Sequence, residues 1–476
     1  MFIRLLQGGS RVYEVSAPSE TAVRAGAQRH SIHPAQLEFL NLNGAGCSPH
    51  IAHVPVEITV VGALDTSDLV TAFRGIVEQQ AALRSSYDLE GGSPVAVVEH
   101  SAPVKLRSID ISPAPKWLQK TLLQIGFTLM LHRRFNQRKG PLYRACLFKL
   151  GPVEHCFVLV FDHIVFDGWS VGVLTRALAE RCRRPGKGHS DPRFKERYFE
   201  YADAHRAWLA PGQGSETDIA YWKRAMADTF IPFWIPEEQV RLRRGARASI
   251  RTYLLPEATT GAMHEIARIG RMSAWMIMLA AFCVVLYEWT AQEDTLVATF
   301  HSGRPTAELY DTVGCCFDVW PLRVRISEQM TFLDLANAVK NHYLEALPHL
   351  RLPFRRISKI FYETRAEARA LPIYFNYVPD YGAKRSGIAA DGVSVRGRQL
   401  IGPRHFTVRG DTRKLYLEAR EHESVVHWRL FYGSTILSYD TVCRLAERLE
   451  RVLEQATRAP TSTISSLRLT GQRPTP

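Results

Sequence analysis

The stretch that decides the fold is CFVLVFDHIVFDGWS, residues 156–170. Its first six residues form an unbroken apolar run, which is short for a helix and suits a β-strand buried on both faces. An aspartate ends the run, and His163 follows it directly. A helical pattern continues after Ser170, a residue type that can cap a helix. The order strand, histidine, loop, Asp167-Gly168 and helix therefore predicts a titratable imidazole held rigidly beside a crevice.

The length of the chain favours two lobes over a single core. The chain has 476 residues, of which 46% are hydrophobic and 22% charged, as is typical of a folded globular protein. We expect an extension at 1–30, a first lobe at 31–185 that carries the histidine, and a linker and second lobe at 186–476. The boundary falls near 183–192, the most loop-like interior segment. The order of strand and helix patterns predicts a mixed α/β fold, repeated in both lobes.

The net charge of +13 favours an acidic partner. The charge is scattered, and we find no zinc finger, aromatic RNA-binding motif or long basic arm, so nucleic acid is not the expected partner. A short basic cluster contains Arg241, Arg243 and Arg244. It is either a solvated loop, the more common case, or a docking site for an acidic protein.

Cysteine usage and hydropathy favour a cytoplasmic protein. The eight cysteines show no CxxC pairing, and the adjacent Cys315 and Cys316 suit neither a metal site nor a structural disulfide. The N-terminus has too short an apolar stretch for a signal peptide. The longest uncharged run, between Arg271 and Glu288, is shorter than the roughly 18–20 residues that a membrane span needs, so we expect a buried core helix there.

His163 is the candidate catalytic residue. An imidazole titrates near neutrality and can take a proton from an attacking nucleophile, although a lone histidine after a strand is more often structural. Asp167 either orients the histidine or anchors the loop through an arginine, and we favour the anchor because arginines are abundant. Gly168 suggests a sharp turn or a close backbone approach, and Trp169 suggests packing.

Other catalytic motifs are missing from the sequence. We find no Gly-x-Ser-x-Gly elbow, Walker loop, Rossmann glycine pattern or HExxH. A histidine base without a covalent nucleophile suits direct transfer, in which a deprotonated substrate amine or hydroxyl attacks an activated acyl group.

Most of the sequence resembles one known protein family. Residues 162–170 are similar to the HHxxxDG motif of nonribosomal peptide synthetase condensation domains, and the similarity extends from about residue 31 to about residue 455. Further segments resemble the other motifs of that family in the expected order: Pro34-Ala35-Gln36, Ala82-Leu83-Arg84, 198–208, Gly303-Arg304-Pro305, 314–322, Leu352-Pro353-Phe354 and Phe375-Asn376.

The resemblance implies a V-shaped pair of chloramphenicol-acetyltransferase-like lobes with a tunnel between them. It also implies a carrier protein that brings an acyl thioester on its phosphopantetheine arm, and no cofactor or metal bound by the enzyme itself. His163 is then the residue at the acceptor nucleophile, as base or as positioner. Asp167 is then mainly structural, and Arg304 is the candidate partner of its carboxylate.

The chain also departs from the family's pattern. The motif's first histidine is Asp162, which either packs and hydrogen-bonds or, as a second carboxylate, raises the pKa of His163. Asp318 replaces the asparagine of the fifth motif, and a cysteine pair replaces its aromatic pair. With Asn376 from a later motif, Asp318 is the candidate for the acceptor pocket. These departures affect the expected acceptor more than the fold.

We expect a freestanding, monomeric acyltransferase in natural-product biosynthesis. Adenylation and carrier domains are missing from the sequence, which favours transfer of a peptidyl or polyketide chain to a soluble small molecule as an amide or ester. The positive charge suits an acidic carrier protein. Two alternatives stay open: a catalytically silent module that recruits a partner protein, which Asp162 permits, and an epimerisation-type relative.

Overall fold

The computed structural model describes residues 10–14, 27–44, 52–90, 93–101, 104–183, 197–227, 248–364, 373–379, 393–399, 415–422, 425–433 and 437–467. The chain forms two compact units, each a mixed α/β structure around a six-stranded sheet, which confirms the predicted fold class. The first unit comprises Met1–Ala210, Arg304–Phe317 and Tyr381–Gly402, and the rest forms the second.

This division differs from the predicted boundary near residue 185. The first unit continues beyond that point through α7 (Tyr198–Trp208), and it takes in two segments from much later in the chain. Part of the predicted extension also belongs to its sheets. Strand β1 (Ser10–Glu14) pairs with β6 (Lys105–Asp110), and β2 (Gln28–Ser31) pairs with β5 (Val95–Val98).

The main sheet of the first unit has the strand order β1-β6-β7-β8-β3-β13. Its remaining strands are β7 (Tyr143–Lys149), β8 (Glu154–Asp162), β3 (His53–Val61) and β13 (Ser394–Gln399). Neighbours pair antiparallel except β6 and β7, which are parallel. Strand β13 comes from a segment more than three hundred residues after β3, its pairing partner. A smaller sheet has the order β2-β5-β4, with β4 at Ser85–Asp88.

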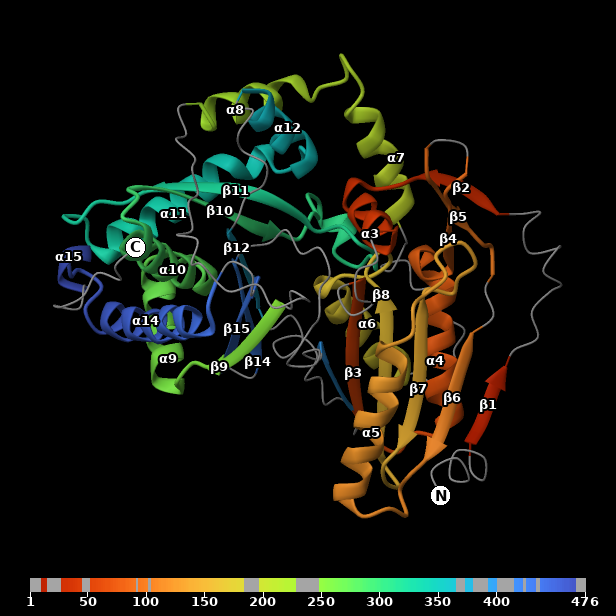
Figure 1. Ribbon diagram of the computed structural model, residues 1–476. Coiled ribbons are helices and arrows are strands. Elements are labelled where there is room, and N and C mark those ends of the chain that lie inside the picture. Colours follow the sequence, from red (N-terminus) through yellow and green to blue (C-terminus); the bar gives the residue numbers. More distant parts are fainter. Residues whose placement is uncertain are drawn as a thin grey trace. The chain divides into compact units, whose positions relative to one another are not determined.

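Strand β8 is central in this sheet and buried on both faces, as its apolar run predicts. Phe157, Leu159 and Phe161 join the core beneath α4 (Thr66–Gln79) and α6 (Gly168–Cys182). The alternate side chains of Val158 and Val160 pack against α5 (Lys116–Leu131), which lies across the opposite face (Figure 1). Because β8 packs against an apolar layer on each face, its register is fixed. The position of its last residue, and of the turn that follows, is therefore fixed as well.

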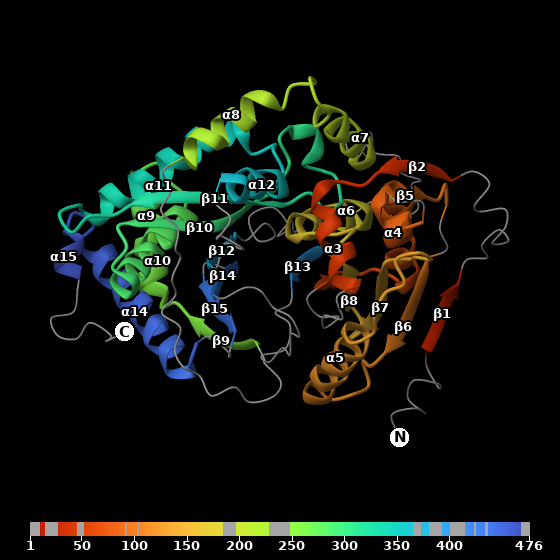
Figure 2. The ribbon, with the colours of Figure 1, turned by 45° about the horizontal axis from the view of Figure 1, so that its top comes forward.

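The helices α3 (Pro34–Gly44) and α7 complete the first unit. Figure 2 shows α7 beside β2, where Phe199 stacks on His30 with ring centroids 5.2 Å apart. A 3₁₀ turn, Ala81–Arg84, links α4 to β4, and another, Ala307–Leu309, lies in the returning segment. The helix α3 carries the Ala35-Gln36 pair singled out in the sequence.

The second unit repeats the element mix, with the strand order β11-β10-β12-β14-β15-β9. The strands are β11 (Asp318–Arg325), β10 (Asp294–His301), β12 (Ile373–Val378), β14 (Leu415–His422), β15 (Val425–Gly433) and β9 (Ala248–Leu254). Strand β12 is parallel to both its neighbours, and the other pairs are antiparallel.

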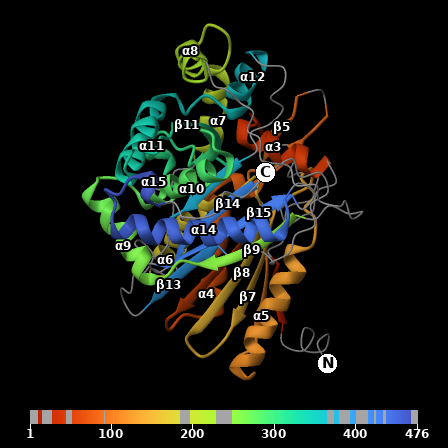
Figure 3. The same ribbon diagram turned by 60° about the vertical axis from the view of Figure 1, so that its left-hand side comes forward.

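Helices cover one face of this second sheet. The predicted apolar helix is α10 (Ala274–Thr290), whose residues from Met276 to Tyr287 are all buried. Figure 3 shows α14 (Tyr439–Arg458) lying along β15. The other helices are α8 (Glu216–Ala225), α9 (Glu257–Ile269), α11 (Phe332–Ala346), α12 (Phe354–Thr364) and α15 (Ile464–Leu467), with a 3₁₀ turn at Leu347–His349.

Hydropathy and cysteine state complete the description. Among the described helices, none is by itself long and apolar enough to cross a membrane, and α9 and α10 pass that test only as a pair bent by 110°. All seven cysteines in the described ranges are free.

Candidate active site

The turn after β8 carries His163. Its backbone amide donates to the carbonyl of Ala52 at 2.7 Å, and Val165 N donates to Asp162 O at 3.1 Å, so the turn is closed on both sides. Helix α6 then begins at Gly168, earlier than predicted. Its N-cap is Asp167, not Ser170: the carboxylate of Asp167 accepts from Ser170 N, and Ser170 lies three residues into the capping box. The prediction of Ser170 as the cap was wrong: both residue types cap helices well, and the turn after β8 places Asp167 at that position.

Gly168 has an ordinary helical role. It is the first residue of α6 and does not belong to the described residues with a left-handed backbone. The close backbone approach occurs instead at Gly314, where a Cβ atom would lie 2.3 Å from the Tyr198 ring. The glycine that sterics require at this site is therefore Gly314, which the sequence marked only as the start of the 314–322 motif segment.

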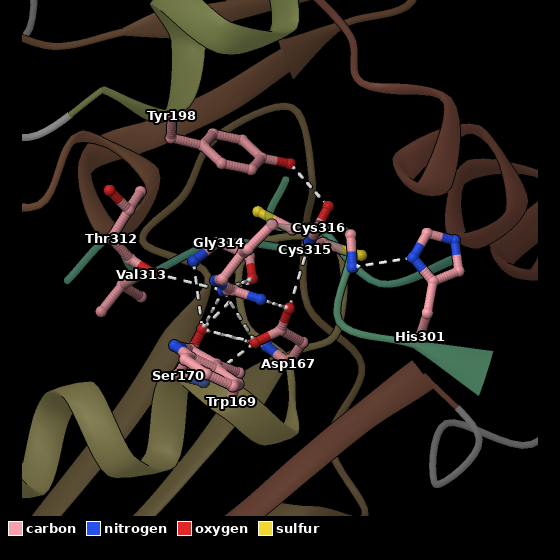
Figure 4. A network of polar contacts seen from close by, with 12 residues as sticks. Asp167, Trp169, Ser170, Tyr198, His301, Thr312, Val313, Gly314, Cys315 and Cys316 are labelled. Atoms are coloured by element: carbon pink, nitrogen blue, oxygen red, sulfur yellow. Dashed lines mark hydrogen bonds and ion pairs between the residues drawn. The ribbon is translucent and has the colours of Figure 1, made fainter. Parts of the chain in front are cut away.

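Asp167 is the centre of a buried polar network (Figure 4). Its Oδ2 accepts from Arg304 Nη1 at 2.7 Å and from Cys316 N at 3.1 Å, and its Oδ1 accepts from the Ser170 hydroxyl at 2.7 Å. The Asp167 side chain is 1% exposed and that of Arg304 is fully buried. This is the pairing that the resemblance implied. Burial raises the pKa of the Asp167 carboxyl, but the charge and hydrogen bonds of Arg304 outweigh it and hold that pKa below its ordinary value.

The same network ties the returning segment 304–317 to the start of α6. Arg304 Nη2 donates to Thr312 O at 3.2 Å, and the backbone amide of Gly314 donates to the Ser170 hydroxyl at 3.1 Å. The Tyr198 hydroxyl donates to the carbonyl of Cys315 at 3.0 Å (Figure 4). Asp167 therefore acts as an anchor for two chain segments, and its oxygens are occupied by donors other than His163.

The His163 ring contacts two aromatic side chains, which also contact each other. It stacks on Phe39 with centroids 4.5 Å apart and an interplanar angle of 18°, and it lies 5.0 Å from the ring of Phe317. The ring is half-buried. Phe39 comes from α3 and Phe317 from the end of the returning segment. Two rings from distant parts of the chain thus restrict the rotation of the imidazole, and the sequence reading named neither as a site residue.

Asp162, the first residue of the motif, has hydrogen-bond partners other than His163. Its carboxylate accepts from Gln137 Nε2 at 3.0 Å and from Ile164 N at 3.1 Å. The residue is 1% exposed and pairs across the sheet with His53. Burial raises the pKa of the Asp162 carboxyl to about 6, against the opposing effect of the Ile164 and Gln137 hydrogen bonds. Of the two roles predicted for Asp162, this geometry favours packing and hydrogen bonding.

Gln36 holds the turn from the side of α3. Its Nε2 donates to Ile164 O at 2.7 Å and to the Tyr87 hydroxyl at 2.6 Å, while its Oε1 accepts from His33 N at 3.0 Å. The residue is fully buried. The Ala35-Gln36 motif therefore positions the backbone of the residue that follows His163. Trp169 has a packing role, since its Nε1 donates to Tyr310 O at 2.9 Å and its ring lies against Tyr310.

The residues predicted for the acceptor pocket lie in the second unit. Asp318 Oδ2 accepts from Phe354 N at 3.2 Å, at the start of α12, where a carboxylate is favourable for the helix dipole. Asn376 on β12 donates to the Tyr416 hydroxyl at 3.2 Å. The basic residues Arg241, Arg243 and Arg244 lie outside the described residues. Within the described ranges, we find no group of three or more His, Cys, Asp or Glu side chains suited to a metal ion.

A protein-family model matches nearly all of this chain. The model described as the Condensation domain matches residues 28–475. Chondramide synthase cmdD of Chondromyces crocatus is 26% identical over 439 residues, which are 91% of this chain and 11% of that protein. This chain spans between 4% and 28% of the length of the first three curated relatives that it matches.

Solved structures show the same fold at low sequence identity. The condensation domain from the monacolin K polyketide synthase MokA aligns with a TM-score of 0.75 at 18% identity, over 92% of this chain and 99% of that one. The SgcC5 protein from Streptomyces globisporus, in complex with (R)-(-)-1-(2-naphthyl)-1,2-ethanediol and sucrose, aligns with a TM-score of 0.70 at 21% identity, over 91% of this chain and 100% of that one.

Proposed function

This chain belongs to the condensation-domain family, and from that premise we propose that it transfers an acyl group from the phosphopantetheine thioester of a carrier protein to the amine or hydroxyl of a small acceptor. The observation that carries the proposal is the His163 imidazole at the end of a central strand, half-buried, stacked on Phe39 and in tilted contact with Phe317. A ring held in this way can meet a bound nucleophile in one orientation.

We assign His163 the handling of the acceptor's proton. The acceptor nitrogen or oxygen attacks the thioester carbonyl, so that a C–N or C–O bond forms and the C–S bond breaks. His163 accepts the proton that the nucleophile loses and passes it to the departing thiolate, which leaves as the carrier's thiol. Asp167 has no part in this proton transfer, because Arg304, Ser170 and Cys316 occupy its oxygens.

Charge and fold supply further support for the partners. The net charge of +13 is complementary to an acidic carrier protein, and the cluster of Arg241, Arg243 and Arg244 is our candidate for part of the docking surface. The SgcC5 structure is a complex with a small aryl diol, a molecule of the size and chemistry that we propose for the acceptor here. The product is then an amide or an ester of the carrier-bound acyl chain.

The test is a transfer assay with intact-protein mass spectrometry. A carrier protein loaded with an acyl chain is mixed with the enzyme and a panel of amines and alcohols, and loss of the acyl mass from the carrier is followed with time. We expect His163→Ala to slow transfer by about a hundredfold or more, because general acid–base catalysis contributes roughly 10²–10⁴-fold. His132→Ala, an exposed histidine just after α5, is the control and should leave the rate unchanged.

Two results would overturn the proposal. Transfer by the His163→Ala variant at the wild-type rate would remove the proton-transfer role. Carrier binding without acylation of any acceptor would favour the alternative of a silent recruitment module.

A further inference from the structure

One face of the sheet in the second unit carries polar and aromatic side chains to which the proposed function assigns no role. On β14 and β15, the side chains of Leu417, Ala419, Trp428 and Leu430 are buried on the face that α9, α10 and α14 cover. The alternate residues point to the opposite face. They are Tyr374, Asn376, Tyr416, Glu418, Arg420, Arg429 and Phe431, together with Phe300 on β10.

A carboxylate with two guanidinium groups lies on this face. Glu418 Oε2 accepts from Arg429 Nε at 2.7 Å and pairs with Nη2 at 2.5 Å, while its Oε1 accepts from Arg420 Nη2. Glu418 is 4% exposed. Burial raises its pKa, but the two arginines outweigh burial and lower that pKa to about 2, so Glu418 stays ionised. One negative and two positive charges leave the cluster with a net charge of +1.

One nitrogen of Arg429 is left for another acceptor. Arg429 is 8% exposed, and its Nη1 is buried with no hydrogen-bond partner among the described residues. A buried donor without an acceptor is costly, and a ligand oxygen is one group that would satisfy it. An open nitrogen is not enough by itself to mark a site, since Nη1 of Arg448, whose other nitrogens bind Glu288 and Leu467 O, shares the property.

What distinguishes Arg429 is the aromatic surface around it. Its guanidinium lies 4.6 Å from the centre of the Phe431 ring, and Phe431 stacks on Tyr416 at 5.1 Å with an interplanar angle of 20°. The Tyr416 ring lies 5.9 Å from Phe300 and 6.3 Å from Tyr374. Phe300, Tyr374 and Phe431 are half-buried, so part of each ring is left for contact. A flat ring can stack here while its oxygen substituent reaches the cation.

We propose that this face binds a small molecule that carries both an aromatic ring and a free carboxylate, with the carboxylate on Arg429 Nη1. The proposal goes beyond the proposed function and gives the second unit a ligand site of its own. A net positive cluster favours the free carboxylate of a soluble aromatic amino acid over the neutral amide or thioester of the same molecule.

The test compares two probes that differ only at the carboxyl group. Binding of L-phenylalanine and of L-phenylalaninamide to the full chain is measured by isothermal titration calorimetry. We expect the acid to bind about ten- to a hundredfold more tightly, the size of one charge-assisted hydrogen bond. The Arg429→Gln substitution should bring this ratio close to one, whereas Phe431→Leu should weaken both probes and keep the ratio.

Partial unfolding of a variant lowers the binding of both probes alike and therefore does not change the ratio of their dissociation constants. Arg448→Gln is the matched control, because it removes an arginine from a partly buried Arg–Glu pair of the same unit and should leave the ratio unchanged. Equal binding of acid and amide by the wild-type chain, no binding of either, or a preserved ratio in Arg429→Gln overturns the inference.

The binding ratio tests this site independently of acyl transfer. If the acid binds selectively but no acceptor is ever acylated, the carboxylate site stands and the proposed function falls. If transfer is observed but acid and amide bind equally, the proposed function stands and the carboxylate site falls.

Discussion

The two carboxyl groups at the ends of the His163 turn, Asp162 and Asp167, are equally buried, but their pKa values are shifted in opposite directions. Asp162 and Asp167 are each 1% exposed. Burial raises the pKa of Asp162 to about 6, because its donors are a neutral amide side chain and a backbone amide. The pKa of Asp167 is lowered in spite of burial, because Arg304 supplies a full positive charge. What decides the state of a buried carboxylate is therefore its counter-charge and not its depth.

This difference gives the two groups opposite effects on stability as the pH changes. Asp162 binds its proton more tightly in the folded state, so its contribution is present below pH 4 and is lost as the pH rises through about 6. Asp167 binds its proton less tightly in the folded state, so its contribution is present above pH 4 and is lost as the pH falls through its lowered pKa. Substitutions of Asp162 and of Asp167 should therefore separate the two contributions to the pH dependence of stability.

The largest effect is expected at the Asp167 end. Asp167→Asn leaves the Arg304 charge buried without a counter-ion and turns an amide N–H toward a guanidinium. We expect a loss of about 3–5 kcal/mol in the free energy of unfolding, measured by urea denaturation at pH 7. The double variant Asp167→Asn/Arg304→Met removes both charges and should recover part of that loss. A single variant as stable as the wild type would contradict the anchor role.

The sequence was most informative where one segment carries the whole pattern. The apolar run of β8 predicted a strand buried on both faces, and the motif order predicted that Arg304 would meet Asp167. Long-range partners left no such pattern. Strand β13, which completes the first sheet, lies among residues whose alternation is interrupted by glycine and arginines. Its place in the first unit follows from pairing with β3, which no local property encodes.

The surroundings of His163 show the same limit. Phe39 reads as one more apolar residue of a helix, and Phe317 as part of a motif region, so neither announces a contact with the imidazole. Gln137 lies 25 residues before Asp162 in a loop. A hydrogen bond of that range is set by tertiary packing and leaves no local pattern in the sequence. The Ser170 cap was mispredicted for a local reason, since two residues in the stretch could both cap and only geometry chose between them.

The next effect is expected at the Asp162 end, with the opposite dependence on pH. Asp162→Asn keeps the shape and removes the ionisation, so the variant should lack the loss that the wild type shows between pH 4 and pH 7. That loss is of the order of 2–3 kcal/mol for a buried carboxyl with this pKa. Unfolding free energies of both proteins at pH 4.5 and pH 7.5 test this. If the two curves run parallel, Asp162 is not the titrating group.

A smaller effect is expected at Gln36, which donates a hydrogen bond to the His163 turn from α3. Gln36→Leu removes the hydrogen bond to Ile164 O and leaves that buried carbonyl only the longer bond from the Tyr87 hydroxyl at 3.4 Å, at a cost of about 1–3 kcal/mol. It should also lower the rate of acyl transfer, because the residue next to His163 loses its constraint. Gln119→Leu is the matched control: Gln119 is also buried and donates to three carbonyls beneath α5. It should lower stability with no change in rate once the folded fraction is corrected for.

The smallest effect should come from Trp169 on α6, whose ring lies 5.7 Å from the Arg304 guanidinium and whose Nε1 donates to Tyr310 O. Trp169→Phe keeps an aromatic ring against Tyr310 and removes the Nε1 hydrogen bond to Tyr310 O. Because the indole is half-buried, water can replace the lost partner, and we expect about 0.5–1 kcal/mol in the free energy of unfolding. Urea denaturation resolves a change of that size when the slope is unaltered. A loss as large as that of Asp167→Asn would mean that the anchoring network extends through Trp169 to the segment at Tyr310, and the contrast between a closed charged core and a solvated edge would no longer hold.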